Sequence, residues 1–205
     1  YNTATGFTAD TFAQVTAADP TQIIAVNQAV DARTKGSLEE IAPTTVKPNG
    51  YEDWQVPWEK QVETIADAVG KKDEGDKLID DTEKAFEEFR HEHAELQDKS
   101  AAIVMPYDGK IGLYTEEDGR GQFIEDLGME IPDALQGNGG SFFVDIAPEN
   151  YAKLNQVDYL FVLDYNGSSD VLKKDKTFQG LYVVKYKRVR YLDTDTGNAM
   201  SMPNP

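Results

Sequence analysis

The chain of 205 residues contains no cysteine, which excludes disulfides, thiolate catalysis and cysteine metal sites. Histidine is almost as scarce: His91 and His93 are the only two, and side chains two positions apart on a helix diverge and do not share a metal. Long hydrophobic runs are also missing, because no stretch approaches the roughly 20 apolar residues that span a bilayer. Several common kinds of site are therefore excluded before any motif is considered.

Positive charge is in short supply as well. Lysine and arginine number 20 against 37 aspartates and glutamates, which gives a net charge of −17. A charge of this sign repels phosphate backbones and anionic lipid surfaces, so nucleic acid is not an expected partner. One segment departs from this average, since residues 171–190 carry seven basic side chains and a single acidic one, Asp175. This segment is either a solvated surface or a region that attracts an anionic ligand.

A similar sequence pattern occurs twice in the chain, at Phe12–Val26 and at Glu149–Leu163. Each copy predicts a helix that leads into an apolar strand, Ile23–Val26 in the first copy and Tyr159–Leu163 in the second. Two such units separated by a long helical segment indicate two lobes, and a cleft between lobes is a common place for a small ligand. A binding protein is therefore an early hypothesis.

The other patterns predict alternating strands and helices, which is typical of an α/β protein with mainly parallel pairing. We expect an irregular stretch from residue 27 through residue 40, a helix that begins near Pro57 and ends at Gly70, and a long helix over about residues 73–96. Further strands are expected at 44–46, 101–105, 110–114, 181–185 and 189–192, with a turn at 106–109 and a helix over 121–127.

Candidate ligand contacts follow from the positions of the strand ends. Ligands of open α/β sheets bind beyond the carboxyl ends of parallel strands, a rule that selects Asn27, Tyr107 and Tyr165. Tyr51 and Trp54 lie in the turn after another short strand, where their flat faces would suit a planar chelate. Trp58 lies on the apolar stripe of its helix and is expected in the core instead.

Several segments in the same order resemble one family. The segment 37–44 (SLEEIAPT) and Trp58, which heads a helix ending in 65–70 (IADAVG), are similar to the corresponding run of iron-siderophore substrate-binding proteins of ABC importers. Residues 119–123 (GRGQF) resemble the family's ligand-contacting loop, and 187–193 (KRVRYLD) resemble its last matched strand. The resemblance covers nearly the whole chain.

The resemblance implies a class III periplasmic-binding-protein-like fold, in which two Rossmann-like lobes are joined by one long helix. Residues 1–70 would form part of an N-terminal lobe, 71–98 the linking helix and 99–205 the C-terminal lobe. The N-terminal lobe would be incomplete, because the family's first strand and last helix lie outside the matched region. The chain would then be a fragment, which would account for the absence of a signal peptide and a lipidated cysteine.

The function implied by the resemblance is capture of a ferric siderophore and its delivery to an ABC permease, with no enzyme activity and no cofactor. The protein would be a monomeric, extracytoplasmic lipoprotein, periplasmic or on the cell surface. Arg120 would contact the ligand, whereas Tyr165 stands where some relatives carry a basic contact, so the charge of the chelate stays open. Glu149 would contact the permease. The equivalent position of the first copy is Ala13, with Asp10 close by.

Two alternatives accompany this hypothesis. The same family could bind haem or a corrinoid, with Tyr107 or Tyr165 ligating or covering the macrocycle. A metal-dependent hydrolase on a two-lobed scaffold could instead use loop carboxylates that suit Ca²⁺, namely Glu116, Glu117, Asp118, Asp193 and Asp195.

Overall fold

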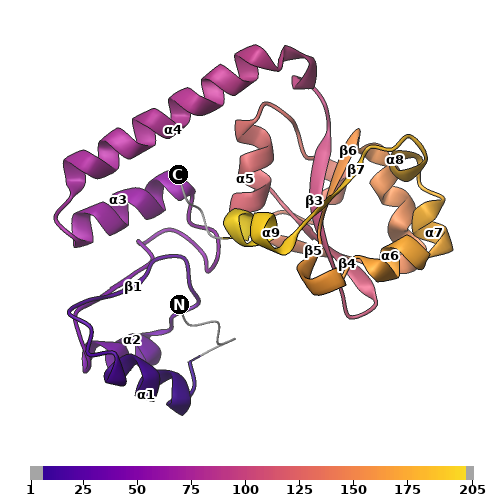
Figure 1. Ribbon diagram of the computed structural model, residues 1–205. Helices are drawn as coiled ribbons and strands as arrows, with labels where there is room; N and C mark the ends of the chain where they lie inside the picture. The colour runs from indigo at the N-terminus through magenta and orange to yellow at the C-terminus, as the bar shows by residue number, and fades with distance from the viewer. Residues whose placement is uncertain (1–6, 202–205) are drawn as a thin grey trace. The chain divides into compact units, whose positions relative to one another are not determined.

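The computed structural model describes residues 7–201, and the chain divides into two compact units, residues 1–79 and 80–205 (Figure 1). Helices and strands alternate in both units, as expected for an α/β protein. Among the described residues, no helix combines the length and the apolar character needed to cross a membrane.

The first unit contains a small parallel sheet, in which β1 (Ile23–Ala25) pairs with β2 (Thr44–Val46). It is preceded by α1 (Ala9–Ala17), which begins with a capping box between Thr8 and Thr11. The irregular stretch expected from residue 27 through residue 40 is wrong over most of its length, because α2 (Ala32–Glu39) forms there. The Asp31 carboxylate caps this helix, accepting the Thr34 N–H at 2.7 Å, and Leu38 anchors it in the core.

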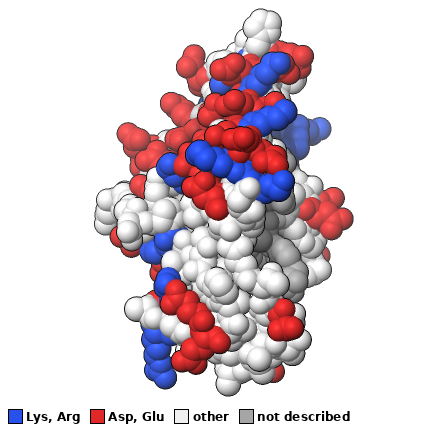
Figure 2. Space-filling model, turned by 90° about the vertical axis from the view of Figure 1, so that its left-hand side faces the viewer, with Lys and Arg blue, Asp and Glu red and all other residues white. Residues whose placement is uncertain are grey.

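The first unit also contains α3 (Trp58–Ala68) and the start of α4 (Lys72–Glu92), which continues into the second unit. They approach so closely at Gly75 that a Cβ there would lie 2.4 Å from the Cβ of Ala66. Trp58 is 9% exposed, in agreement with its predicted core position. Figure 2 shows acidic side chains interleaved with basic ones over α4, where Lys84 lies 3.8 Å from Glu88 one turn away.

The second unit is built on a sheet with the strand order β5-β4-β3-β6-β7. The strands are β3 (Ala101–Tyr107), β4 (Lys110–Tyr114), β5 (Phe143–Ile146), β6 (Tyr159–Leu163) and β7 (Val189–Leu192). The expected parallel pairing is found for β3, β6 and β7, but β4 pairs antiparallel with both β3 and β5. A two-residue turn causes the reversal, because Asp108 and Gly109 both have positive φ (46° and 75°).

Short helices cover both faces of this sheet (Figure 1). One face is covered by η3 (Pro148–Gln156), α6 (Asp170–Lys174), α7 (Lys176–Gln179) and α8 (Tyr182–Lys185), and the other by α5 (Gly119–Asp126) and α9 (Thr194–Ser201). Successive residues of β3 alternate between the two cores: Ala102 packs with η3 and α7, whereas Ile103 packs with α5.

The strand expected at residues 181–185 is wrong, since this segment forms α8. Leu181 and Val183 are buried on either side of exposed Tyr182, an alternation that a strand would also produce. The backbone hydrogen bonds identify a helix, because Lys185 N–H donates to Leu181 O at 3.0 Å and Tyr186 N–H donates to Tyr182 O at 2.8 Å. A four-residue helix is too short for its periodicity to be read from the sequence.

Gly121 is the tightest point of the second unit, and its replacement gives a testable expectation. A Cβ at Gly121 would lie 1.9 Å from the carbonyl oxygen of Thr115, a backbone atom that cannot move aside. We expect Gly121→Ala to lower the free energy of unfolding by about 1–3 kcal/mol, measured by urea denaturation. Gly36→Ala is the matched control, because Gly36 lies inside α2 with nothing within 4 Å of its Cβ position. This control should stabilise by about 0.5–1 kcal/mol, and equal effects of the two changes would contradict the expectation.

Candidate functional site

Arg120 lies at the start of α5 and is fixed by Asp118, the residue that caps this helix. Asp118 Oδ1 accepts from the Arg120 backbone N–H at 2.9 Å and from Nε at 2.7 Å, while Nη2 donates to Oδ2 at 2.8 Å. The two side chains are only 17% and 5% exposed. Burial alone would lower the pKa of Arg120, but the hydrogen bonds and charge of Asp118 outweigh it and raise the pKa above its usual value. The two side chains form a salt bridge, which carries no net charge.

Aromatic rings extend from this ion pair along one face of the sheet. The Arg120 guanidinium lies 3.6 Å from the centre of the Tyr114 ring, a cation–π contact. The Tyr114 ring is 5.7 Å from Phe143, and Phe143 is 5.6 Å from Tyr107. The Tyr107 hydroxyl donates to Asp145, which also pairs with Lys110. Two predicted contacts, Arg120 and Tyr107, are thus linked through rings that the sequence did not single out.

Tyr165 joins the same cluster from the end of β6. Its hydroxyl donates to the Gly197 carbonyl at 2.8 Å and lies 2.7 Å from Ser201 Oγ, which in turn accepts from Arg120 Nη1 at 3.1 Å. Gly197 is required for this approach, because a Cβ there would lie 3.0 Å from the Tyr165 ring. The structure therefore brings Arg120, Tyr107 and Tyr165 into one set of contacts, called here the arginine–tyrosine cluster, which also includes Tyr114, Phe143, Asp118 and Ser201.

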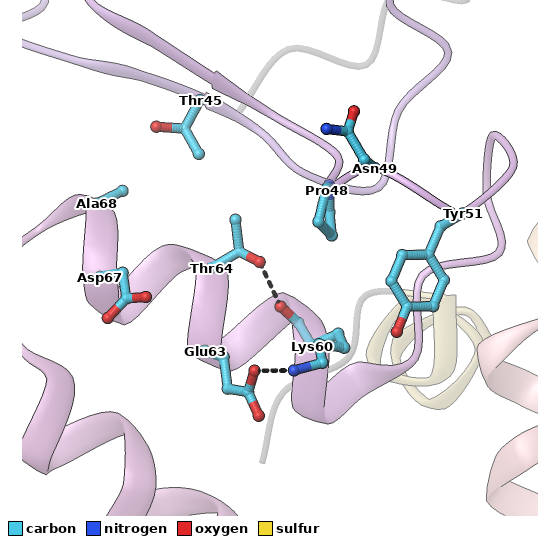
Figure 3. A pocket seen from close by; sticks show the side chains of 9 residues that line it. All are labelled: Thr45, Pro48, Asn49, Tyr51, Lys60, Glu63, Thr64, Asp67 and Ala68. Atoms are coloured by element: carbon cyan, nitrogen blue, oxygen red, sulfur yellow. Dashed lines mark hydrogen bonds and ion pairs between the residues drawn. The ribbon is translucent and has the colours of Figure 1, made fainter.

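The predicted contacts of the first unit are less closely associated. Tyr51 lines an open groove of about 660 Å³ beside α3, together with Lys60 and Glu63, which pair with each other (Figure 3). Asn27 has a structural role, since its side-chain oxygen accepts the Val56 N–H at 3.2 Å. Trp54 is 37% exposed and adopts a positive φ of 69° in the same loop. Neither Asn27 nor Trp54 lines the groove, whose remaining residues are Thr45, Pro48, Asn49, Thr64, Asp67 and Ala68.

The predicted permease contact, Glu149, lies in the first turn of η3 and is exposed. It forms no ion pair within residues 7–201. In the first copy of the repeated sequence pattern, Ala13 lies within α1, and Asp10 accepts a hydrogen bond from the Gln14 side chain at 2.7 Å. The two copies differ in backbone as well as in charge, because η3 is a 3₁₀ helix where α1 is an α-helix.

The carboxylates considered for Ca²⁺ do not assemble into a metal site. No group of three or more potential metal ligands occurs in the described part of the chain. Asp118 is occupied by Arg120, Glu116 accepts from the Gln136 amide at 3.0 Å, and Asp193 accepts the Thr196 N–H at 2.9 Å. Three of the five carboxylates thus have a local structural partner, and the five do not form a cluster, which does not favour the hydrolase alternative.

Sequence reasoning missed four members of the cluster, and their signals differ. Asp118 was considered only as a possible Ca²⁺ ligand, although an aspartate just before a helix is a common N-cap. Tyr114 and Phe143 are direct cross-strand partners, a relation that depends on knowing that β4 pairs with β5. Ser201 gave no signal, since its contact with Arg120 joins segments far apart in the sequence.

Solved structures provide an independent comparison. The iron uptake ABC transporter substrate-binding protein PiaA from Streptococcus pneumoniae TIGR4 superposes with a TM-score of 0.78 at 24% identity, over 98% of this chain and 69% of that chain. The same protein in complex with ferrichrome gives a TM-score of 0.79 at 24% identity, over 95% and 67%. FhuD from S. pseudintermedius gives 0.72 at 22% identity, over 95% and 73%. These likenesses confirm the predicted fold class.

The family comparison extends over almost the entire chain. No curated protein matches this chain. The model of the family described as "Periplasmic binding protein" matches residues 8–196. Its members are extracytoplasmic binding proteins and not enzymes, in agreement with the sequence-based prediction. The match confirms the resemblance found in the sequence, and the chain belongs to the periplasmic binding protein family.

Proposed function

We propose that the protein captures a ferric siderophore and delivers it to an ABC permease for iron uptake. The arginine–tyrosine cluster carries this proposal, because it combines flat aromatic faces with a guanidinium close to the end of β6. One relative, PiaA, is described as an iron uptake substrate-binding protein, and a second structure of it is described as a complex with ferrichrome. Exposed Glu149 is the proposed permease contact, and the lipid anchor and monomeric state stay predictions.

The electrostatics of the cluster favour a chelate with little net charge. Asp118 neutralises Arg120, so the cluster has no excess positive charge with which to bind a highly anionic ferric catecholate. Three N–H groups of the guanidinium are used by Asp118 and Ser201. The remaining guanidinium N–H groups can donate to neutral oxygen acceptors. We therefore favour a ferric hydroxamate as the ligand class.

Fluorescence quenching of the full-length protein tests this assignment. The panel contains ferrichrome, a ferric catecholate, ferric citrate and haem, and we expect ferrichrome to quench tryptophan emission at micromolar concentration while the catecholate binds more weakly. Asp118→Asn should reverse part of this preference, because it releases the positive charge of Arg120. Absence of quenching by all ferric chelates would remove the proposal. Tight binding of haem alone would favour the macrocycle alternative.

A further inference from the structure

A group of basic and aromatic side chains lies at the end of α8, on the opposite side of the sheet from α5. This basic tyrosine patch consists of Tyr182, Lys185, Tyr186, Lys187 and Arg188. Tyr182 and Tyr186 are 60% and 70% exposed; among the large hydrophobic side chains in the described part of the chain, Tyr186 is the most exposed, and Val171 at 62% lies between the two. Their rings lie one helical turn apart, with centres separated by 6.5 Å. Two tyrosines therefore stand side by side in water.

The charges of the patch are only partly neutralised. Arg188 pairs with Asp158 at 3.0 Å and lies 6.0 Å from the Tyr186 ring centre. Lys185 and Lys187 are exposed and form no ion pair within residues 7–201. In a chain with a net charge of −17, this is a local excess of positive charge beside exposed aromatic surface.

The backbone at Lys187 gives an independent sign of function. Arg188 N–H donates to Val183 O at 2.9 Å and Lys187 N–H to Val184 O at 3.0 Å, the two bonds of a Schellman motif. The motif places Lys187 at the left-handed position, with a φ of 58°, where glycine is usual and costs less. A lysine at this position makes the fold less stable than a glycine would, and it adds an exposed charge. Such a strained residue points to a function of the surface that carries it.

The patch lies away from the arginine–tyrosine cluster. The Arg188 carbonyl accepts the Leu160 N–H near the start of β6, whereas Tyr165 follows the end of that strand. The two groups thus lie at opposite ends of β6. A partner bound at the patch would leave the cluster open to its ligand.

We propose that the basic tyrosine patch docks on anionic phospholipid headgroups. Tyrosine is enriched at membrane interfaces, and lysine near an anionic surface is attracted by its potential. Tyrosine and arginine are also common in protein interfaces, but lysine is depleted there, so the two lysines favour the lipid surface. The net charge of the whole chain opposes approach to such a surface. Charges more than about 8 Å away are largely screened at physiological salt, so the local charge decides the orientation.

Vesicle co-sedimentation tests the proposal and does not depend on the siderophore. The full-length protein should bind vesicles of equal parts phosphatidylglycerol and phosphatidylcholine at low salt, lose binding as salt rises, and ignore phosphatidylcholine alone. Removing a patch lysine, as in Lys185→Ala or Lys187→Ala, should lower the partition coefficient about fivefold each. Lys84→Ala on α4 is the control, because it removes the same charge from an exposed site elsewhere and should have no such effect.

Lys187→Gly separates charge from stability. It should raise the thermal midpoint by relieving the left-handed backbone, yet lower vesicle binding as much as Lys187→Ala. Unchanged vesicle binding in Lys187→Gly, or an equal loss in Lys84→Ala, would overturn the proposal. Self-association that depends on Lys187, without vesicle binding, would also overturn it, in favour of a second copy as the partner. Siderophore affinity should be the same in all these variants.

Discussion

Replacing Arg120 with alanine is expected to lower the free energy of unfolding of the second unit by about 3–5 kcal/mol. The change leaves the Asp118 carboxylate, 5% exposed, without its counter-ion, and it removes the guanidinium from the Tyr114 ring. Both tryptophans, Trp54 and Trp58, belong to the first unit, so unfolding of the second unit is best followed by near-ultraviolet circular dichroism of its tyrosines.

A double-mutant cycle identifies the cause of this loss. Asp118→Asn combined with Arg120→Ala should cost less than the sum of the two single changes, because no buried charge is then left unpaired. Arg120→Ala alone should also weaken the binding of a ferric hydroxamate by about 0.5–1.5 kcal/mol, the range of an ordinary hydrogen bond. A loss of stability below about 1 kcal/mol for Arg120→Ala would show that Asp118 is hydrated in solution, contrary to its burial here.

Phe178→Ala is the second change with a large expected effect. Phe178 is 0% exposed in the core beneath α7, and its ring meets Tyr151 edge-on at 6.0 Å. Deleting a buried phenylalanine ring leaves a cavity that the surroundings fill only in part, so we expect a loss of about 3–5 kcal/mol in urea denaturation.

Two variants serve as controls for Phe178→Ala. Phe178→Leu keeps most of the side-chain volume and should cost much less. Val171→Ala truncates a side chain that is 62% exposed and should stay within about 0.5 kcal/mol of the parent protein. If Phe178→Ala cost no more than Val171→Ala, the packing of α7 against the sheet described above would be wrong.

The sequence predicted elements best where the local signal was complete. The turn predicted at 106–109 was placed two residues too early, since Pro106 and Tyr107 belong to β3, but its existence was predicted, and the apolar run at 159–163 indicated β6. The α2 helix was missed because its start depends on the Asp31 cap and its eight residues include Gly36 and Ser37, which weaken the helical pattern. The α8 helix was taken for a strand because four residues satisfy either periodicity.

The candidate site was accessible to sequence reasoning only in part. The strand-end rule and the family resemblance selected Tyr107, Tyr165 and Arg120, which the structure connects by contacts. These contacts pass through partners set by strand register and by the position of α9, and neither is encoded locally. The rule also selected Asn27, whose side chain is used to hold the backbone of Val56. The strand ends therefore predicted where candidate ligand contacts lie along the chain, whereas long-range packing determined which residues surround them.

The mixed sheet of the second unit has a consequence for the order of folding. The β3–β4 hairpin closes over the turn at Asp108 and Gly109, whereas β3 reaches β6 through pairs such as Ala101 with Tyr159. Local hairpins form within microseconds, and pairings of long sequence separation form later. The half of the sheet that contains Tyr107 and Tyr114 should therefore form before β6 pairs with β3 and positions Tyr165, which follows β6. Ligand binding would then report completion of the last step of folding and not of the first.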